Sequence, residues 1–282
     1  TFGRGATPHK GGKSRNSGIM PVLGLRYRLS DALQLYASTG RGFETPTLNE
    51  VAYKASGASG LNSQLAASKS RNSEVGLRGR HGSLGWTATA FDIRTDDEIA
   101  VLTNTGGRST YQNAGRSLRR GVELSGEAQW GHLHANVAWT LMKAIYRDGF
   151  FTCAASPCSK PNVPVPAGSR IPGVAREQLF VQLDWEPRPL PAVFTLELRH
   201  MGSIFVNDTN TDAAPAYTVA SLGAQFKRQQ GPWELRALAR IDNLTNRVYA
   251  GSVIVNEGNQ RYFETAPGRT AFVGVELQRR FD

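Results

Sequence analysis

The two cysteines of the sequence, Cys153 and Cys158, are five positions apart in the polar segment FFTCAASPCSK. A pair at this spacing could contribute to a metal site or could close a small disulfide loop. Two thiolates alone make a poor zinc site, because structural zinc takes four ligands. A disulfide requires an oxidising environment. The chemistry of this pair therefore depends on where the segment lies.

No other group of residues predicts catalysis or metal binding. The acidic run DDE, from Asp96 to Glu98, has too few oxygen ligands for a calcium site. No glycine-rich loop follows a strand and opens a helix, as a phosphate-binding loop would. We therefore expect no enzyme and no metal site. The histidines also lack a spacing with cysteines or carboxylates that would indicate one; they are His9, His81, His132, His134 and His200.

The sequence is basic, with 33 Lys and Arg against 23 Asp and Glu and a formal net charge of +10. A nucleic-acid partner would account for such a balance if the charge were concentrated. The basic residues are instead scattered along the whole length, which fits a basic lumen or rim equally well. We expect no nucleic-acid partner.

Apolar and polar residues alternate with period two over long segments. In one of them Leu133, Ala135 and Val137 alternate with His134 and Asn136. This pattern predicts strands with one apolar and one polar face. We expect about eleven strands, near residues 19–29, 32–41, 70–80, 84–96, 112–128, 132–145, 172–185, 192–203, 215–228, 232–244 and 269–281.

The lengths of the strands and of their connections indicate a membrane barrel. Most strands run to about ten residues or more, longer than the usual five or six of soluble sheets. Tight turns alternate strictly with long loops, which is typical of outer-membrane barrels, where periplasmic turns are short and extracellular loops are long. A soluble sandwich, the alternative, would not require that order. The expected extracellular loops are 42–69, 97–111, 146–171, 204–214 and 245–268.

Eleven strands do not close into a natural antiparallel barrel, because the first and last strands would run parallel. An open sheet would leave bare edges in the bilayer. The sequence therefore predicts an all-β, transmembrane antiparallel barrel of which these are about eleven C-terminal strands, half of a 22-stranded barrel with a plugged lumen.

Three segments carry a resemblance to a known family. GRGFETPTLNE, YQNAGRSLRRGVEL and ARIDNLTNRVY resemble the barrel of TonB-dependent outer-membrane receptors, over nearly all of residues 19–282. RIPGVAREQ, the paired-cysteine loop and GSVIVNEGNQRYFETAPGR are most similar to receptors for pyrroloquinoline quinone. Residues 1–18 are expected to be an extracellular loop or the start of a fragment.

The resemblance implies energised transport across the bacterial outer membrane. It further implies an N-terminal plug, which is not among these 282 residues, through which the TonB–ExbB–ExbD motor acts. Phe281 is expected to be the signal read by the barrel assembly machinery, and lipopolysaccharide and outer-membrane lipid are expected to surround the barrel. A ferric siderophore is the alternative ligand, and a passive porin or adhesin barrel is the alternative class of function.

The resemblance also implies the chemistry of the site. On the cell surface, Cys153 and Cys158 are expected to form a disulfide. Both candidate ligands are small and anionic, so arginine forks would bind carboxylates and tyrosine rings would stack. Each of these arginines could instead bind lipopolysaccharide phosphate at the rim. The candidate ligand-binding residues are Arg41, Arg71, Arg108, Tyr111, Arg176, Arg261 and Tyr262.

Overall fold

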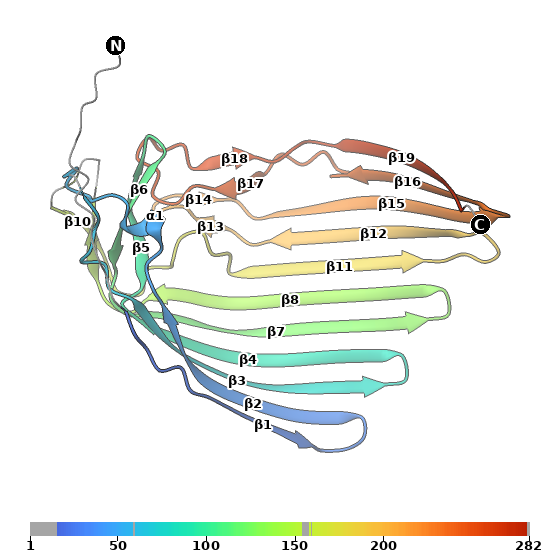
Figure 1. Ribbon diagram of the computed structural model, residues 1–282, viewed down its shortest axis with the longest axis horizontal. Helices are drawn as coiled ribbons and strands as arrows, with labels where there is room; N and C mark the ends of the chain where they lie inside the picture. Colours follow the sequence, from blue (N-terminus) through green and yellow to red (C-terminus); the bar gives the residue numbers. More distant parts are fainter. Residues whose placement is uncertain (1–15, 59, 154–157, 159, 281–282) are drawn as a thin grey trace, which may run out of the picture.

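The computed structural model describes residues 16–58, 60–153, 158 and 160–280. Its main feature is one antiparallel sheet of eleven strands, which run side by side along the long axis in Figure 1. The expected number of strands is confirmed. In sheet order they are β1 (Val22–Arg28), β2 (Leu33–Glu44), β3 (Ser68–His81), β4 (Leu84–Asp96), β7 (Ser117–Trp130), β8 (Leu133–Tyr146), β11 (Glu177–Trp185), β12 (Ala192–Met201), β15 (Tyr217–Gln230), β16 (Trp233–Asp242) and β19 (Thr270–Arg279).

The register of the sheet brings the apolar residues of neighbouring strands together. Val137 of β8 lies opposite Val181 of β11, whereas the adjacent Asn136 lies opposite Gln182. Directly opposed residues share a face, so the pleat gives the sheet an apolar face and a polar face. The expected division of the strands into two faces is confirmed.

The apolar face is unusually open to its surroundings. Val273 and Val275 of β19 are 74% and 72% exposed. Trp130, Trp185 and Trp233 lie on this face at the ends of their strands next to the short turns. Exposed valine and leucine bounded by tryptophan are typical of a barrel surface that contacts lipid, with the indole rings at the membrane interface.

The polar face carries ion pairs between strands. Glu197 accepts hydrogen bonds from Arg199 at 2.9 Å and from Arg240 at 2.7 Å. Nearer the short turns, Arg80 pairs with Glu127 at 2.8 Å. Glu197 and Arg199 thus belong to a charge network on the polar face of the sheet.

The long connections are gathered at one end of the sheet, at the left of Figure 1, and the tight turns are at the other end. At the turns Gly82 and Gly131 have φ of 57° and 59°, a conformation that favours glycine. No helix within the described residues is long and apolar enough to cross a membrane.

The long connections are more regular than the sequence predicts. Each of four contains a two-stranded hairpin, and a one-turn helix, α1 (Leu48–Val51), is capped by Thr47 and Glu50. The hairpins are β5 (Ile99–Thr105) with β6 (Arg108–Asn113), β9 (Phe150–Thr152) with β10 (Val163–Val165), β13 (Ile204–Phe205) with β14 (Ala213–Ala214), and β17 (Ala250–Val253) with β18 (Phe263–Thr265).

Two predicted strand starts are wrong for local reasons. The strand expected from residue 112 begins at Ser117, because Gln112 and Asn113 pair within the hairpin of β5 and β6. The strand expected from residue 172 begins at Glu177. Pro172 has no N–H to donate to a ladder, and Gly173 has a φ of 76°, outside the extended range of a regular strand.

Candidate functional site

The connections at the loop end pack into one structure, which we call the loop layer (residues 45–67, 97–116, 147–176, 202–216 and 243–269, where described). Its core is a cluster of buried side chains from β5, β8, β10 and the approach to β11. Tyr146 is the largest of them, and Phe150 packs on its ring at 4.8 Å. The cluster consists of Ala100, Ala114, Ala144, Tyr146, Val165 and Ile171.

A hydrogen-bonded network links loops from distant strands. Asn256, between β17 and β18, donates to the carbonyl of Val101 at 2.7 Å and to Asp208 at 2.8 Å. Tyr146 donates to the other Asp208 oxygen at 2.8 Å. Burial raises the pKa of Asp208, against the effect of these two donors. The strands that precede β5 and β17 lie toward opposite edges of the sheet. The loop layer therefore extends across the loop end of the curved sheet.

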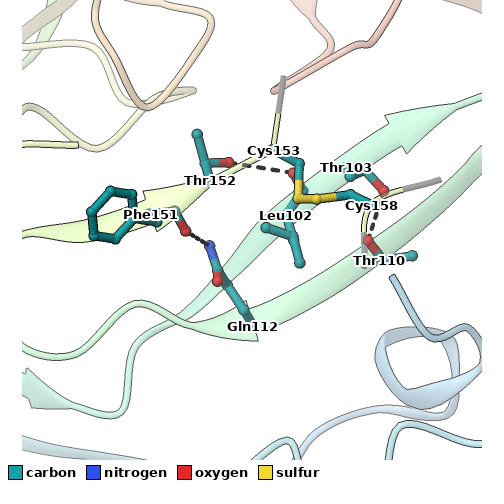
Figure 2. Close-up of a disulfide and its surroundings, with 8 residues drawn as sticks. All are labelled: Leu102, Thr103, Thr110, Gln112, Phe151, Thr152, Cys153 and Cys158. Atoms are coloured by element: carbon teal, nitrogen blue, oxygen red, sulfur yellow. Dashed lines mark hydrogen bonds between the residues drawn. A yellow bond between two sulfur atoms is a disulfide. The ribbon is translucent and has the colours of Figure 1, made fainter. Parts of the chain in front are cut away.

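The two cysteines form a disulfide, as expected, with Cα atoms 6.1 Å apart. Figure 2 shows it beside the hairpin of β5 and β6. Gln112 of β6 donates to the carbonyl of Phe151 at 3.0 Å, and the Cys158 amide donates to Ala55 at 2.8 Å. The disulfide loop is therefore fastened both to the hairpin and to the segment after α1.

Two arginines flank the turn at Pro172 and Gly173, Arg170 before it and Arg176 after it, directly before β11. Asn210 accepts from the Arg170 amide at 2.6 Å and donates to its carbonyl at 2.9 Å. Burial and the charge of Arg176 lower the pKa of Arg170. Neither guanidinium makes an ion pair with any residue that the structure describes. Two uncompensated guanidinium groups suit an anion with carboxylate oxygens.

Aromatic rings accompany these cations. The Arg170 guanidinium lies 5.3 Å from the ring centroid of Phe205. On the polar face of the sheet, Tyr217 at the outer end of β15 packs on Tyr249 with centroids 4.2 Å apart. Cations and ring faces thus both occur at the loop end of the sheet.

The other loop residues predicted from the sequence lie elsewhere in the loop layer. Arg108 lies over the ring of Tyr53 at 5.3 Å, and Tyr111 accepts from Asn62 through its carbonyl. The Arg261 amide donates to Glu257, and the adjacent Tyr262 packs edge-on against Phe263. The glycine after Glu257 bonds Asn104 of β5, so the segments that carry Arg261 and Arg108 are neighbours. The described contacts do not bring any of these four residues to Arg176.

Arg41 and Arg71 are brought together, but on the other side of the sheet. They lie directly opposite each other on β2 and β3, in register with Ala37 and Val75 of the apolar face. Their expected position near the strand tops is correct. Their side of the sheet is the one that faces away from the lumen, so this geometry does not support contact with a ligand there.

Sequence reasoning missed Arg170, Phe205, Tyr217 and Tyr249. Arg170 begins the RIPGVAREQ segment that ends beyond Arg176, so the two arginines could have been considered together. The rings carry no comparable signal, because tyrosine and phenylalanine at strand ends are common in barrels. The predicted role of Phe281 lies outside the described residues.

The acidic run near residue 97 serves the fold. Glu98 accepts from Arg119 at 2.7 Å and from Ser117 at 2.6 Å. Burial opposes ionisation, but these donors hold the pKa of Glu98 below its usual value. The described part of the chain has no group of three or more His, Cys, Asp or Glu placed to hold a metal ion.

The comparisons with known proteins decide the family. The family model described as "TonB dependent receptor-like, beta-barrel" matches residues 1–244. The chain belongs to this family. It is 26% identical over 253 residues to the vitamin B12 transporter BtuB of Photobacterium profundum, a match that covers 86% of the chain and 36% of the transporter. The TonB-dependent receptor barrels of this family lie in the outer membrane.

Solved structures show the same fold. The siderophore receptor PiuA from Acinetobacter baumannii superimposes with a TM-score of 0.72 at 17% identity, covering 91% of this chain and 35% of the receptor. BauA, the ferric preacinetobactin receptor of the same organism, gives 0.66 at 18% identity, covering 92% and 36%. The chain thus spans about a third of the length of these relatives.

Proposed function

We propose that this chain forms the C-terminal part of the barrel of a receptor that takes up a small anionic ligand across the outer membrane. The observation that carries the proposal is the pair Arg170 and Arg176, two guanidinium groups at the mouth with no carboxylate partner among the described residues. Because like charges repel, an anionic ligand with two carboxylates would stabilise this arrangement.

Pyrroloquinoline quinone is the ligand that the sequence resemblance favours. Its carboxylates would take the arginine forks, and its flat rings would stack on Tyr217 or Phe205. A ferric siderophore is the alternative, supported by the siderophore receptors that share the fold. The BtuB relative adds vitamin B12 as a third ligand to be tested.

Energised rather than passive transport is supported by the loop layer. Hydrogen bonds from Asn256 to Val101 and from Gly258 to Asn104 join two loops across the mouth. A passive pore would instead require an open path there. In our proposal the TonB–ExbB–ExbD motor acts through a plug domain of the complete receptor. A receptor of this kind is a transporter, as its named relatives are, rather than an enzyme.

Calorimetric titration of the complete receptor tests the ligand and the site. We expect Arg170→Ala and Arg176→Ala each to weaken binding at least tenfold, because a charge-assisted hydrogen bond contributes about 1.5–3 kcal/mol. Arg261→Ala tests another arginine that the sequence predicts to bind the ligand. Arg228→Ala, at the opposite end of β15, is the matched control and should bind as wild type does.

Three ligands distinguish the alternatives: pyrroloquinoline quinone, a ferric siderophore and vitamin B12. If the receptor bound only the siderophore or only the vitamin, the quinone would be refuted as its ligand. The proposal that the protein is a transport receptor would stand. Unchanged binding by both Arg170→Ala and Arg176→Ala would refute the arginine pair as the anion site.

A further inference from the structure

Basic side chains are concentrated on the apolar face, at the ends of β2, β3, β4, β7 and β8 next to the loop layer. Across the ladder, Arg41, Arg71 and Arg94 lie opposite one another on successive strands, and Arg120 lies opposite Lys143. All are exposed. We define the outer basic patch as Arg41, Lys69, Arg71, Arg94, Arg116, Arg120, Lys143 and Arg147.

The height of the patch matches a membrane interface. On β8, the apolar face runs from Leu133, next to Trp130 at the turn, to Leu141, and Lys143 follows. These ten or so residues span roughly 25 Å at a rise of about 3.3 Å and the usual strand tilt. That is the thickness of the apolar band of an outer-membrane barrel, so the patch lies at the level of the lipid headgroups.

The patch is local rather than a property of every strand. At or next to the loop ends of four other strands, the apolar face carries Glu177 on β11, His200 on β12, Thr218 on β15 and Ala271 on β19. Insertion into the bilayer alone would not concentrate positive charge on one side of the sheet.

The patch carries more positive charge than its acidic neighbours neutralise. Asp92 pairs with both Arg94 and Arg120, and Asp148 pairs with Arg116 at 2.7 Å. Within the described residues, Arg41 and Arg71 make no ion pair although they lie directly opposite each other. Like charges in such a position destabilise a sheet, and a bound anion would remove that cost.

Two hollows line the patch, one mainly charged and one mainly apolar. The upper one has a volume of about 770 Å³, and five arginines together with Lys69 line it. The lower one, of about 690 Å³, is lined by the charged residues Arg120, Lys143, Arg176, Glu74 and Asp92, and the rest of its lining is mainly apolar. Its apolar lining includes Val75, Ala90, Val122 and Leu141.

We propose that the outer basic patch binds a phosphorylated glycolipid of the outer leaflet, lipopolysaccharide. The guanidinium groups of Arg41, Arg71 and Arg94 hold its phosphates, since a planar fork matches phosphate oxygens. An acyl chain lies in the hollow beside Val122 and Leu141. This assigns Arg41 and Arg71 to lipid binding rather than to the transported ligand. The inference requires only that the barrel lies in the outer membrane, not the identity of that ligand.

Native mass spectrometry of the complete receptor in detergent, titrated with lipid A, tests the proposal. We expect Arg41→Gln/Arg71→Gln to lower lipid A affinity at least tenfold. Arg78→Gln/Arg228→Gln is the matched control, because it removes two arginines, one from the polar face and one from the turn end. Its affinity should equal that of wild type. Heat-modifiable migration of both variants checks that the barrels are folded.

A second experiment uses the wild-type receptor and does not depend on any variant. Lipid A without its phosphates should bind at least tenfold more weakly, and millimolar inorganic phosphate should not displace lipid A. Equal binding of the phosphate-free lipid would show that the acyl chains alone are recognised and would overturn the proposal. Displacement by inorganic phosphate would identify a soluble anion as the occupant, and equal losses in the control variant would point to non-specific charge.

Discussion

At the scale of single residues, the polar side chains of the loop layer divide into those that hold the layer together and those that we propose to contact a ligand. Asp208 is 1% exposed, and Tyr146 and Asn256 donate to it. Arg170 and Arg176 have no such acceptor among the residues described. The presence or absence of such a partner separates structural side chains from candidate ligand-binding side chains better than residue type does.

Replacing Asn256 by alanine should loosen the loop layer. The change removes the donors to Asp208 and to the Val101 carbonyl, and it leaves the buried carboxylate with fewer partners. The local opening free energy should fall by about 1.5–3 kcal/mol. Hydrogen exchange of residues 99–113 and 250–265 should therefore accelerate tenfold or more.

Asn259→Ala is the control, because Asn259 is exposed and, among the described residues, bonds only to Glu257 in the same loop. Equal acceleration in both variants would mean that Asn256 has no special part in joining the loops.

At the scale of elements, the hairpins of the loop layer depend on one another more than on the sheet. The Cys153–Cys158 disulfide lies beside β5 and β6, where Gln112 donates to the Phe151 carbonyl and Thr152 donates to the Leu102 carbonyl (Figure 2). A small disulfide loop contributes roughly 2 kcal/mol by chain entropy. Such an energy can order a loop but is small beside the eleven-stranded ladder.

Cys153→Ser/Cys158→Ser should therefore increase hydrogen exchange in residues 99–113 and 150–165 and leave the barrel strands protected. Heat-modifiable migration should be unchanged, and mild reduction of wild-type receptor should reproduce the effect. Loss of the folded barrel in the variant would contradict this division between loop layer and sheet.

At the scale of the whole molecule, the strict order of strands defines two ends of the sheet that differ in chemistry. The indole rings of Trp130, Trp185 and Trp233 lie at the turn end of the apolar face, and the outer basic patch lies at the loop end. Short turns face the periplasm in barrels of this kind, so the loop layer should be extracellular.

Single-cysteine labelling on intact cells tests this orientation in the complete receptor. An impermeant reagent should modify Asn259→Cys, in the loop layer, and should not modify Ser83→Cys or Gln230→Cys, at the turns. Permeabilised cells serve as the positive control for the turn positions. Labelling of the turns, but not of Asn259→Cys, on intact cells would reverse the topology.

The sequence alone determined the sheet. Alternation such as that from Leu133 to Leu141 sets which residues face lipid, and turns such as that at Gly131 set the order of strands. Even the outward face of Arg41 follows from counting by two from Leu33. These properties are local, because a strand has the same period wherever it lies.

Only the tertiary structure decided the loop layer and the two proposed binding surfaces. Asn256 meets Val101 across 155 positions, and the charges of Arg170 and Arg176 interact across the turn at Pro172 and Gly173. No periodic pattern encodes such contacts. The outer basic patch likewise needs five strands in register, since its charges come from segments separated by tens of residues and meet only when the ladder forms.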